Sequence, residues 1–184
     1  MATITTTQAG SLTAGATYVG GAAPTDGDTV VIEHAVTVEA NFSQTSTTLK
    51  VMNNGTLDTR NAADSTNYNL TIYRMWVYGA TGILKLRDGT HTFNYSNGQG
   101  LYISDYGSTV TMDGCTVNHT GARLKGKLTA TGTNTMNWGY GADVNITDTN
   151  LEGGGEGNFN GTDTWEYNSS RIKWIIDQSG MSSR

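Results

Sequence analysis

Apolar and polar residues alternate in three short stretches of the chain that are almost alike. Each begins with glycine, continues with apolar residues two positions apart and ends with aspartate: Gly82–Asp88, Gly107–Asp113 and Gly141–Asp148. An apolar period of two is that of a strand with one buried face. The return of this unit after 25 and then 34 residues predicts short strands that stack as the rungs of a β-helix or another solenoid.

Further strands are predicted on the N-terminal side of these repeats. A turn cluster at Pro24–Asp28 leads into alternating β-branched residues at Thr29–Glu33 and Ala35–Glu39, and Tyr68–Tyr73 alternates in the same way. Met75–Tyr78 is apolar on both faces. One of these faces is expected to lie toward the interior and the other toward a neighbour.

The spacing of the strands leaves a second architecture open. Rung candidates lie 9 to 21 residues apart, which also suits the strands of an antiparallel β-sandwich. The solenoid is preferred, because the glycine–apolar–aspartate unit recurs in one internal order and the strands of a sandwich need not resemble one another. Both alternatives are all-β.

The chain divides into three parts. Residues 1–22 are small and polar, which predicts a flexible N-terminal arm. Residues 23–160 carry the strand pattern and form the solenoid domain. Residues 161–184 are expected to cap an open solenoid end or to make an oligomer contact. Together with the aromatic residues of the doubly apolar strand they supply the interface candidates: Trp76, Tyr78, Trp165, Tyr167, Ile172, Trp174, Ile175 and Ile176.

The string Pro24–Ile32, followed by Val36-Thr37-Val38, resembles the opening turn of right-handed β-helices found in G8-type domains and in many phage and bacterial surface proteins. In those proteins a Pro-x-x-Gly-Asp turn feeds the first rung. The resemblance covers residues 18–60 and implies a short right-handed parallel β-helix.

Composition and charge narrow the choice of partners. Only 15% of the 184 residues are charged and one is proline, whereas 24 are glycine, so strands and tight turns are favoured over long helices. The net charge of −5 disfavours nucleic acid. The one basic cluster, Arg123, Lys125 and Lys127, is interpreted as a solvated strand face. No signal peptide or membrane segment is predicted, so the protein is expected to be made in the cytoplasm.

The sequence contains little that supports a catalytic site. The triplet Arg171-Ile172-Lys173 matches an element with which polygalacturonases hold a substrate carboxylate, but the other elements of that family do not occur. Asp88, Asp113 and Asp148 would form a cation-binding ladder if the repeats stacked in register. The preferred interpretation is that each accepts hydrogen bonds at a turn. A polysaccharide lyase or hydrolase is therefore the alternative to a protein without catalysis.

Neither a disulfide nor a metal or cofactor site is predicted. Cys115 is the only cysteine and suits a small buried position. Three separated histidines, His34, His91 and His119, do not have the spacing of a zinc site. They are expected to be ordinary surface or core residues.

By analogy with small virion proteins of similar fold, these features predict a non-enzymatic virion protein, a phage capsid decoration (cement) protein or a spike or fibre component. It is expected in the virion as a homo-oligomer, with a trimer favoured, bound to other virion proteins such as the major capsid protein. The alternative is a glycan-binding or glycan-cleaving tail-spike-like module. Its sugars would stack on exposed aromatic residues: Tyr73, Trp76, Tyr78, Tyr95, Tyr102, Tyr106, Trp138 and Tyr140.

Overall fold

The computed structural model shows a short right-handed parallel β-helix, which confirms the all-β solenoid expected from the alternating pattern. It describes residues 1–61, 63, 66–95, 100–103 and 107–119 with their side chains. Beyond them it describes the backbone of further strands between residues 122 and 176, and the side chain of Asn134. The part with side chains makes about four turns.

The strands form three parallel sheets along the solenoid axis, and successive coils pass through them in turn. Sheet 1 contains β1 (Thr3–Thr5), β3 (Thr29–Ile32), the second halves of β5 (Phe42–Val51) and β7 (Leu70–Val77), β9 (Leu101–Ile103), β11 (Ala122–Leu124), β14 (Val144–Thr147) and β17 (Trp165–Asn168). Sheet 2 contains β2 (Gly10–Ser11), β4 (Ala35–Thr37), β6 (Thr56–Asp58), the first halves of β8 (Ile83–Phe93) and β10 (Thr109–His119), β12 (Lys127–Thr131) and β15 (Asn150–Glu152). Sheet 3 contains the first halves of β5 and β7, the second halves of β8 and β10, β13 (Thr133–Trp138), β16 (Glu156–Asn160) and β18 (Ile175–Ile176).

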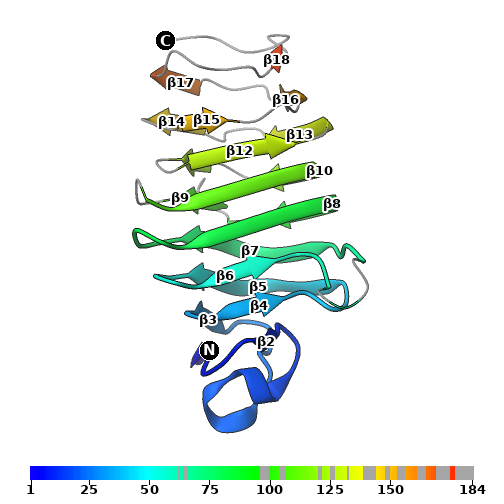
Figure 1. Cartoon of the computed structure of the whole chain (residues 1–184), viewed down its shortest axis with the longest axis vertical. Helices are drawn as coiled ribbons and strands as arrows, with labels where there is room; N and C mark the ends of the chain where they lie inside the picture. The colour runs from blue at the N-terminus through cyan, green and yellow to red at the C-terminus, as the bar shows by residue number, and fades with distance from the viewer. Residues whose placement is uncertain are drawn as a thin grey trace.

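Every pairing between the named strands is parallel. Figure 1 shows the rungs stacked along the long axis, from β2 near one end to β18 near the other. Parallel strands need a crossover connection, and here the other two sheets of each coil provide it. The antiparallel β-sandwich is thereby excluded for the strands described.

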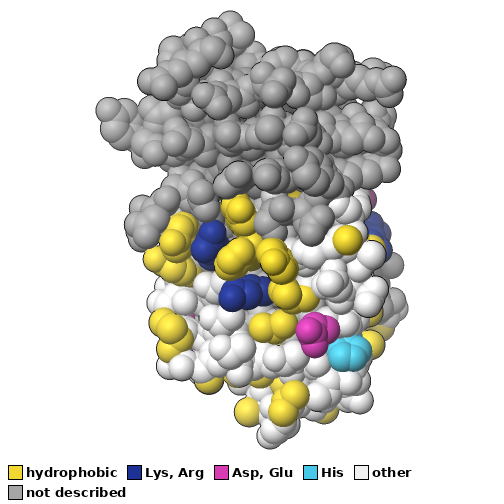
Figure 2. Space-filling model, turned by 90° about the vertical axis from the view of Figure 1, so that its left-hand side faces the viewer, with side chains coloured by type: hydrophobic (Ala, Val, Ile, Leu, Met, Phe, Trp, Pro, Cys, Tyr) yellow, Lys and Arg dark blue, Asp and Glu magenta, His cyan; other side chains and the backbone are white. Residues whose placement is uncertain are grey.

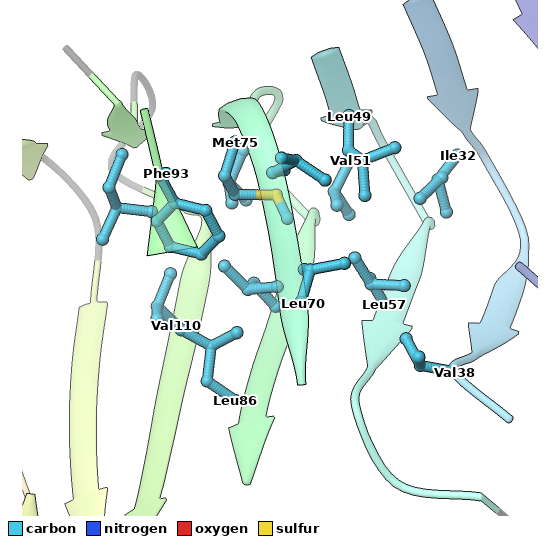
Figure 3. Packing of buried hydrophobic residues seen from close by; sticks show 14 of the residues in the cluster. Ile32, Val38, Leu49, Val51, Leu57, Leu70, Met75, Leu86, Phe93 and Val110 are labelled. Atoms are coloured by element: carbon cyan, nitrogen blue, oxygen red, sulfur yellow. The ribbon is translucent and has the colours of Figure 1, made fainter. Parts of the chain in front are cut away.

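Columns of identical register fill the interior. Val36, Leu57, Leu84 and Val110 follow one another up sheet 2, and each is at most 1% exposed. Figure 3 shows how such side chains from successive coils pack against one another across the lumen. Because side chains alternate along a strand, the residue after each of these faces outward, as the half-buried Lys85 does. The apolar residues of the two-residue period thus face the lumen, and the residues between them face the outer surface.

The first two glycine–apolar–aspartate repeats stack directly, whereas the third lies on another sheet. Val110 pairs with Leu84 and Met112 with Leu86, so these two repeats are neighbouring rungs of sheet 2. The strand of the third repeat, β14, pairs with β11 in sheet 1. All three units are therefore rungs of the β-helix, as the pattern predicts, but they do not all lie in one sheet.

The N-terminal segment differs from the flexible arm expected for residues 1–22. Strand β1 forms the first rung of sheet 1, and the chain then folds across the end of the solenoid through two short 3-10 turns, η1 (Gly15–Thr17) and η2 (Val19–Gly21). Leu12 is fully buried and Tyr18 is 2% exposed. The Tyr18 hydroxyl donates a hydrogen bond of 2.7 Å to the Leu12 carbonyl. Two apolar anchors are therefore enough to dock a polar segment.

The turn at Pro24–Asp28 feeds β3, as its resemblance to β-helix openings implies, but β3 is the second rung because β1 pairs beside it. Asp28 organises this turn. Its carboxylate accepts hydrogen bonds from the Ala2 amide at 2.8 Å, the Thr25 amide at 3.0 Å and the Thr25 hydroxyl at 2.8 Å. These bonds, that from Ala2 foremost, hold the pKa of Asp28 below its ordinary value.

Within the residues described, no helix has the length and apolar character to cross a membrane.

Candidate recognition surface

Three successive rungs present a basic and two aromatic residues on the outer side of sheet 1. Lys50 pairs in register with Trp76, and Trp76 pairs with Tyr102. Their sequence neighbours Leu49, Val51, Met75 and Val77 are fully buried. Alternation along the strands therefore directs the three side chains outward in one column.

A second basic residue, Arg74, lies beside this column among three aromatic rings. Its guanidinium carbon is 4.7 Å from the centroid of the Trp76 ring, 4.5 Å from that of Tyr95 and 5.5 Å from that of Tyr102. The Lys50 ammonium lies 5.0 Å from the Trp76 centroid. Distances under about 6 Å are those of cation–π attraction, so the rings hold both cations in place.

Edge-to-face contacts join the rings into one surface. Trp76 meets Tyr102 at 5.5 Å and Tyr78 at 5.8 Å, and Tyr73 meets Tyr95 at 5.1 Å. We call this group the aromatic–basic patch: Lys50, Tyr73, Arg74, Trp76, Tyr78, Tyr95 and Tyr102. Figure 2 shows a face on which hydrophobic side chains gather around Lys or Arg side chains. Tyr78 is 47% exposed, so the patch is open at that residue.

Several residues predicted from the sequence lie in the patch, and others cannot be placed there. Five of the eight aromatic candidates belong to it. Trp138 lies on β13, while Tyr106 and Tyr140 fall outside the described residues. Of the interface candidates, Trp76 and Tyr78 are in the patch, Trp165 and Tyr167 lie on β17, and Ile175 and Ile176 lie on β18. Ile172 and Trp174, with the rest of the Arg171-Ile172-Lys173 triplet, fall outside the described residues.

Sequence reasoning missed the two cations of the patch. Lys50 lies 26 positions before Trp76, so only the length of the intervening coil shows that they are neighbours. The basic cluster noted in the sequence is divided instead. Arg123 pairs in register with Tyr102 in sheet 1, Lys127 begins β12 in sheet 2, and Lys125 is outside the described residues.

On the outer side of sheet 2, charged residues bind one another. The Arg87 guanidinium binds both Asp58 carboxylate oxygens, with Nε–Oδ1 at 2.8 Å and Nη2–Oδ2 at 3.1 Å. Its Nη1 lies 3.6 Å from Asp113 Oδ2, and Lys85 Nζ lies 3.9 Å from Asp58 Oδ2. The hydrogen bonds to Asp58, more than the other nearby carboxylates, raise the pKa of Arg87. On this surface, ion pairs between charged side chains therefore link neighbouring coils.

The two described aspartates of the repeats, Asp88 and Asp113, do not stand in register with each other. Asp113 stands in register with Arg87. Asp88 Oδ2 accepts a hydrogen bond of 2.8 Å from the side-chain Nδ2 of Asn67, and Asp148 falls outside the described residues. Among the described residues no group of three or more His, Cys, Asp or Glu side chains could hold a metal ion.

The nucleophilic and imidazole groups of sheet 3 are buried. His91 is fully buried and His119 is 3% exposed. Burial lowers the pKa of His91 to about 4, although its ring Nε2 donates a 3.2 Å hydrogen bond to the Arg87 carbonyl oxygen. Cys115 is 2% exposed, and burial raises the pKa of its thiol to about 12. A thiol of that pKa is not a nucleophile at neutral pH.

The fold is that of a right-handed parallel β-helix protein, and its described residues carry the aromatic–basic patch on the outer side of sheet 1. Comparisons with protein-family models, with curated proteins and with solved structures found no match to the chain.

Proposed function

We propose that this protein is a non-enzymatic structural module that contacts other macromolecules through the aromatic–basic patch. The observation that carries the proposal is the concentration of rings and cations on sheet 1, with Tyr78 47% exposed. Aromatic residues and arginine are the side chains most enriched where binding energy is concentrated in interfaces. The described carboxylates on the outer side of sheet 2, Asp58 and Asp113, lie beside Arg87 and Lys85 instead of forming an acid–base pair, which favours a role without catalysis.

The proposed setting is a phage particle, in which the chain decorates the capsid or builds a spike or fibre. The β-helix fold and the resemblance of Pro24–Val38 to the openings of such proteins support this proposal by analogy. In this setting the protein is a homotrimer, located in the virion and bound to other virion proteins such as the major capsid protein. Self-contact is assigned to Trp76 and to the apolar C-terminal segment that contains Trp174.

Sedimentation velocity of the purified chain and mass spectrometry of intact particles test this proposal. We expect a trimer in solution and the chain in the particle. Trp76→Ala and Trp174→Ala are expected to shift the sedimentation coefficient toward that of a monomer, whereas Thr111→Ala, a control on the outer side of sheet 2, leaves it unchanged. A monomeric wild-type chain whose size and stability do not respond to either tryptophan substitution contradicts self-association.

A glycan-binding module is the second candidate function, and the patch favours it specifically. Sugar rings present C–H groups that pack on aromatic rings, and the exposed Tyr78 offers such a ring. A glycan array tests binding, and an assay for released reducing ends tests cleavage. We expect binding without cleavage. An array on which no glycan binds above background eliminates this candidate.

A further inference from the structure

We propose that the aromatic–basic patch binds polysaccharides that carry carboxylate groups. Arg74 and Lys50 pair with the carboxylates, and the exposed ring of Tyr78 contacts the sugar. The inference rests on the glycan-binding candidate function and names the class of its ligand.

Arg74 supplies the group that selects a carboxylate. Three ring centroids lie within 5.5 Å of its guanidinium carbon, so the planar group is fixed in orientation before any ligand arrives. A guanidinium presents N–H donors in a fork that matches the two oxygens of a carboxylate. Rings around it also exclude water, which strengthens its attraction for an anion. The arrangement is that of an anion-binding arginine held in advance.

Lys50 extends the positive charge along the solenoid axis. Its ammonium and the Arg74 guanidinium lie 5.0 and 4.7 Å from the same Trp76 centroid, on a chain whose net charge is −5. Lys50 and Trp76 are on neighbouring rungs, which lie about 4.8 Å apart. Two cations on neighbouring rungs suit a linear polyanion laid along the axis better than a single small anion.

The surroundings of the patch favour a polysaccharide over a peptide. Strand β7 is paired with β5 on one side and with β9 on the other, so no unpaired backbone is available for an added peptide strand. The column below Arg74 consists of threonines, Thr48, Thr29 and Thr3. Hydroxyl groups beside rings and cations match a ligand that is itself rich in hydroxyls and carboxylates.

Isothermal titration calorimetry with polygalacturonate tests this inference, with uncharged dextran and with poly-glutamate as control polymers. We expect polygalacturonate alone to bind. Arg74→Gln should weaken binding at least about tenfold, since a charge-assisted hydrogen bond is lost, and Lys50→Gln should weaken it less. Lys85→Gln, which removes the same charge from the outer side of sheet 2, should change affinity less than twofold. Thermal unfolding of each variant establishes that it is folded.

Fluorescence locates the bound polymer without relying on Arg74. Binding should change the emission of the wild-type chain, and Trp76→Phe, which keeps a ring at this position, should remove most of that change while the three other tryptophans remain.

Other outcomes separate this inference from the candidate function. Equal binding of dextran overturns the selection of carboxylates and leaves glycan binding standing. Equal binding of poly-glutamate, or equal loss in Lys85→Gln, means attraction by charge alone and overturns the inference. If polygalacturonate does not bind, the inference falls, whereas the glycan-binding candidate is judged by the glycan array and the structural role by the sedimentation and particle experiments.

Discussion

At the scale of single residues, asparagine and glycine make the corner between sheets 2 and 3. The Asn41 side-chain oxygen accepts a hydrogen bond of 2.9 Å from the Asn69 amide, and the Asn69 side-chain oxygen accepts one of 2.8 Å from the Thr90 amide. A similar hydrogen bond joins a further pair of coils, in which the Cys115 backbone amide donates to the Asn134 side-chain oxygen at 3.0 Å. Gly114 has a φ of +62° and lies against the Asp88 carboxylate, where a Cβ would collide. The asparagine side chains thus accept hydrogen bonds from backbone amides that have no partner in the sheets at this corner.

The buried His91 makes stability depend on pH. Its pKa is about 4 in the folded chain against 6.5 for an unperturbed histidine, so the unfolded state binds the proton first as pH falls. The contribution of His91 is complete above pH 6.5 and is lost progressively between about pH 6.5 and 4, by about 3 kcal/mol in total. Urea unfolding at a series of pH values measures this loss.

His91→Leu is the informative variant, because Leu70 and Val117 are its aliphatic register partners. It should reduce the slope of stability against pH in that interval, by up to 1.36 kcal/mol per pH unit for one proton. Phe93→Leu, at a fully buried position of the same strand that carries no titratable group, should retain the slope of the wild type. An unchanged slope in His91→Leu would show that other groups cause the acid sensitivity.

At the scale of elements, side chains on the outer surface tie one rung to the next. Arg87 on β8 binds Asp58 on β6 with two hydrogen bonds and approaches Asp113 on β10. The Arg87 and Asp58 side chains are 21% and 18% exposed, so water screens this pair only in part. Lys85 is 37% exposed and 3.9 Å from the same carboxylate. The Asp58 carboxylate therefore has a strong partner in Arg87 and a weak one in Lys85.

This difference predicts unequal costs for two matched substitutions. Arg87→Met should lower the free energy of unfolding by about 1.5–3 kcal/mol, because charge-assisted hydrogen bonds are lost at a partly buried site. Lys85→Met should cost less than about 1 kcal/mol, as exposed ion pairs do. Denaturant unfolding of the two variants measures both values. Equal costs would mean that the paired geometry of Arg87 contributes nothing beyond its charge.

Alternation along β8 predicts a second contrast between neighbours. Leu84→Ala should destabilise the fold by about 2–5 kcal/mol, because Leu84 is fully buried between Leu57 and Val110 and leaves a cavity. Ile83→Ala, one position earlier and half-buried on the outer side, should cost clearly less. Thermal unfolding compares the two. A reversed order would place the lumen on the other face of the strand.

Alternation made the strands and the lumen predictable, but not which sheet each strand joins. Leu84 and Val110 could be assigned to the interior from their own neighbours in sequence. Placing Lys50 beside Trp76 requires the coil length, and this length varies with the loops at the corners, which the apolar pattern does not encode. The same limit explains why the sequence does not reveal that the strand of Val144 lies in sheet 1 whereas that of Leu84 lies in sheet 2.

At the scale of the whole molecule, the open end of the solenoid is closed by residues that the sequence suggested were an arm. Tyr18 packs into this end and fixes the loop through its bond to Leu12. Burial raises the pKa of its hydroxyl, so the group stays neutral and can donate. A cap of this kind hides core and strand edges that would otherwise be exposed to other chains.

The cap predicts a contrast between adjacent residues. Tyr18→Ala should destabilise the protein by about 3–5 kcal/mol and increase association of the chain, because a large buried ring is removed from the end of the core. Val19→Ala should change stability by no more than about 0.5 kcal/mol, since Val19 is 62% exposed. Chemical unfolding with light scattering measures both effects. Unchanged stability in Tyr18→Ala would mean that the segment docks without supporting the solenoid.

The constant register of the outer column of sheet 1 has a consequence for how the chain can lengthen. Residues 31, 50, 76 and 102 are steps of 19, 26 and 26 in the sequence, yet each step is one rung in space. Extra residues at a corner therefore leave the column in line, and a whole inserted coil moves everything beyond it by about 4.8 Å along the axis. An insertion of one third of a coil would instead turn the rest of the molecule to a different face. The outer column can therefore be lengthened only by whole coils, whereas the loops between the sheets can vary in length without disturbing its alignment.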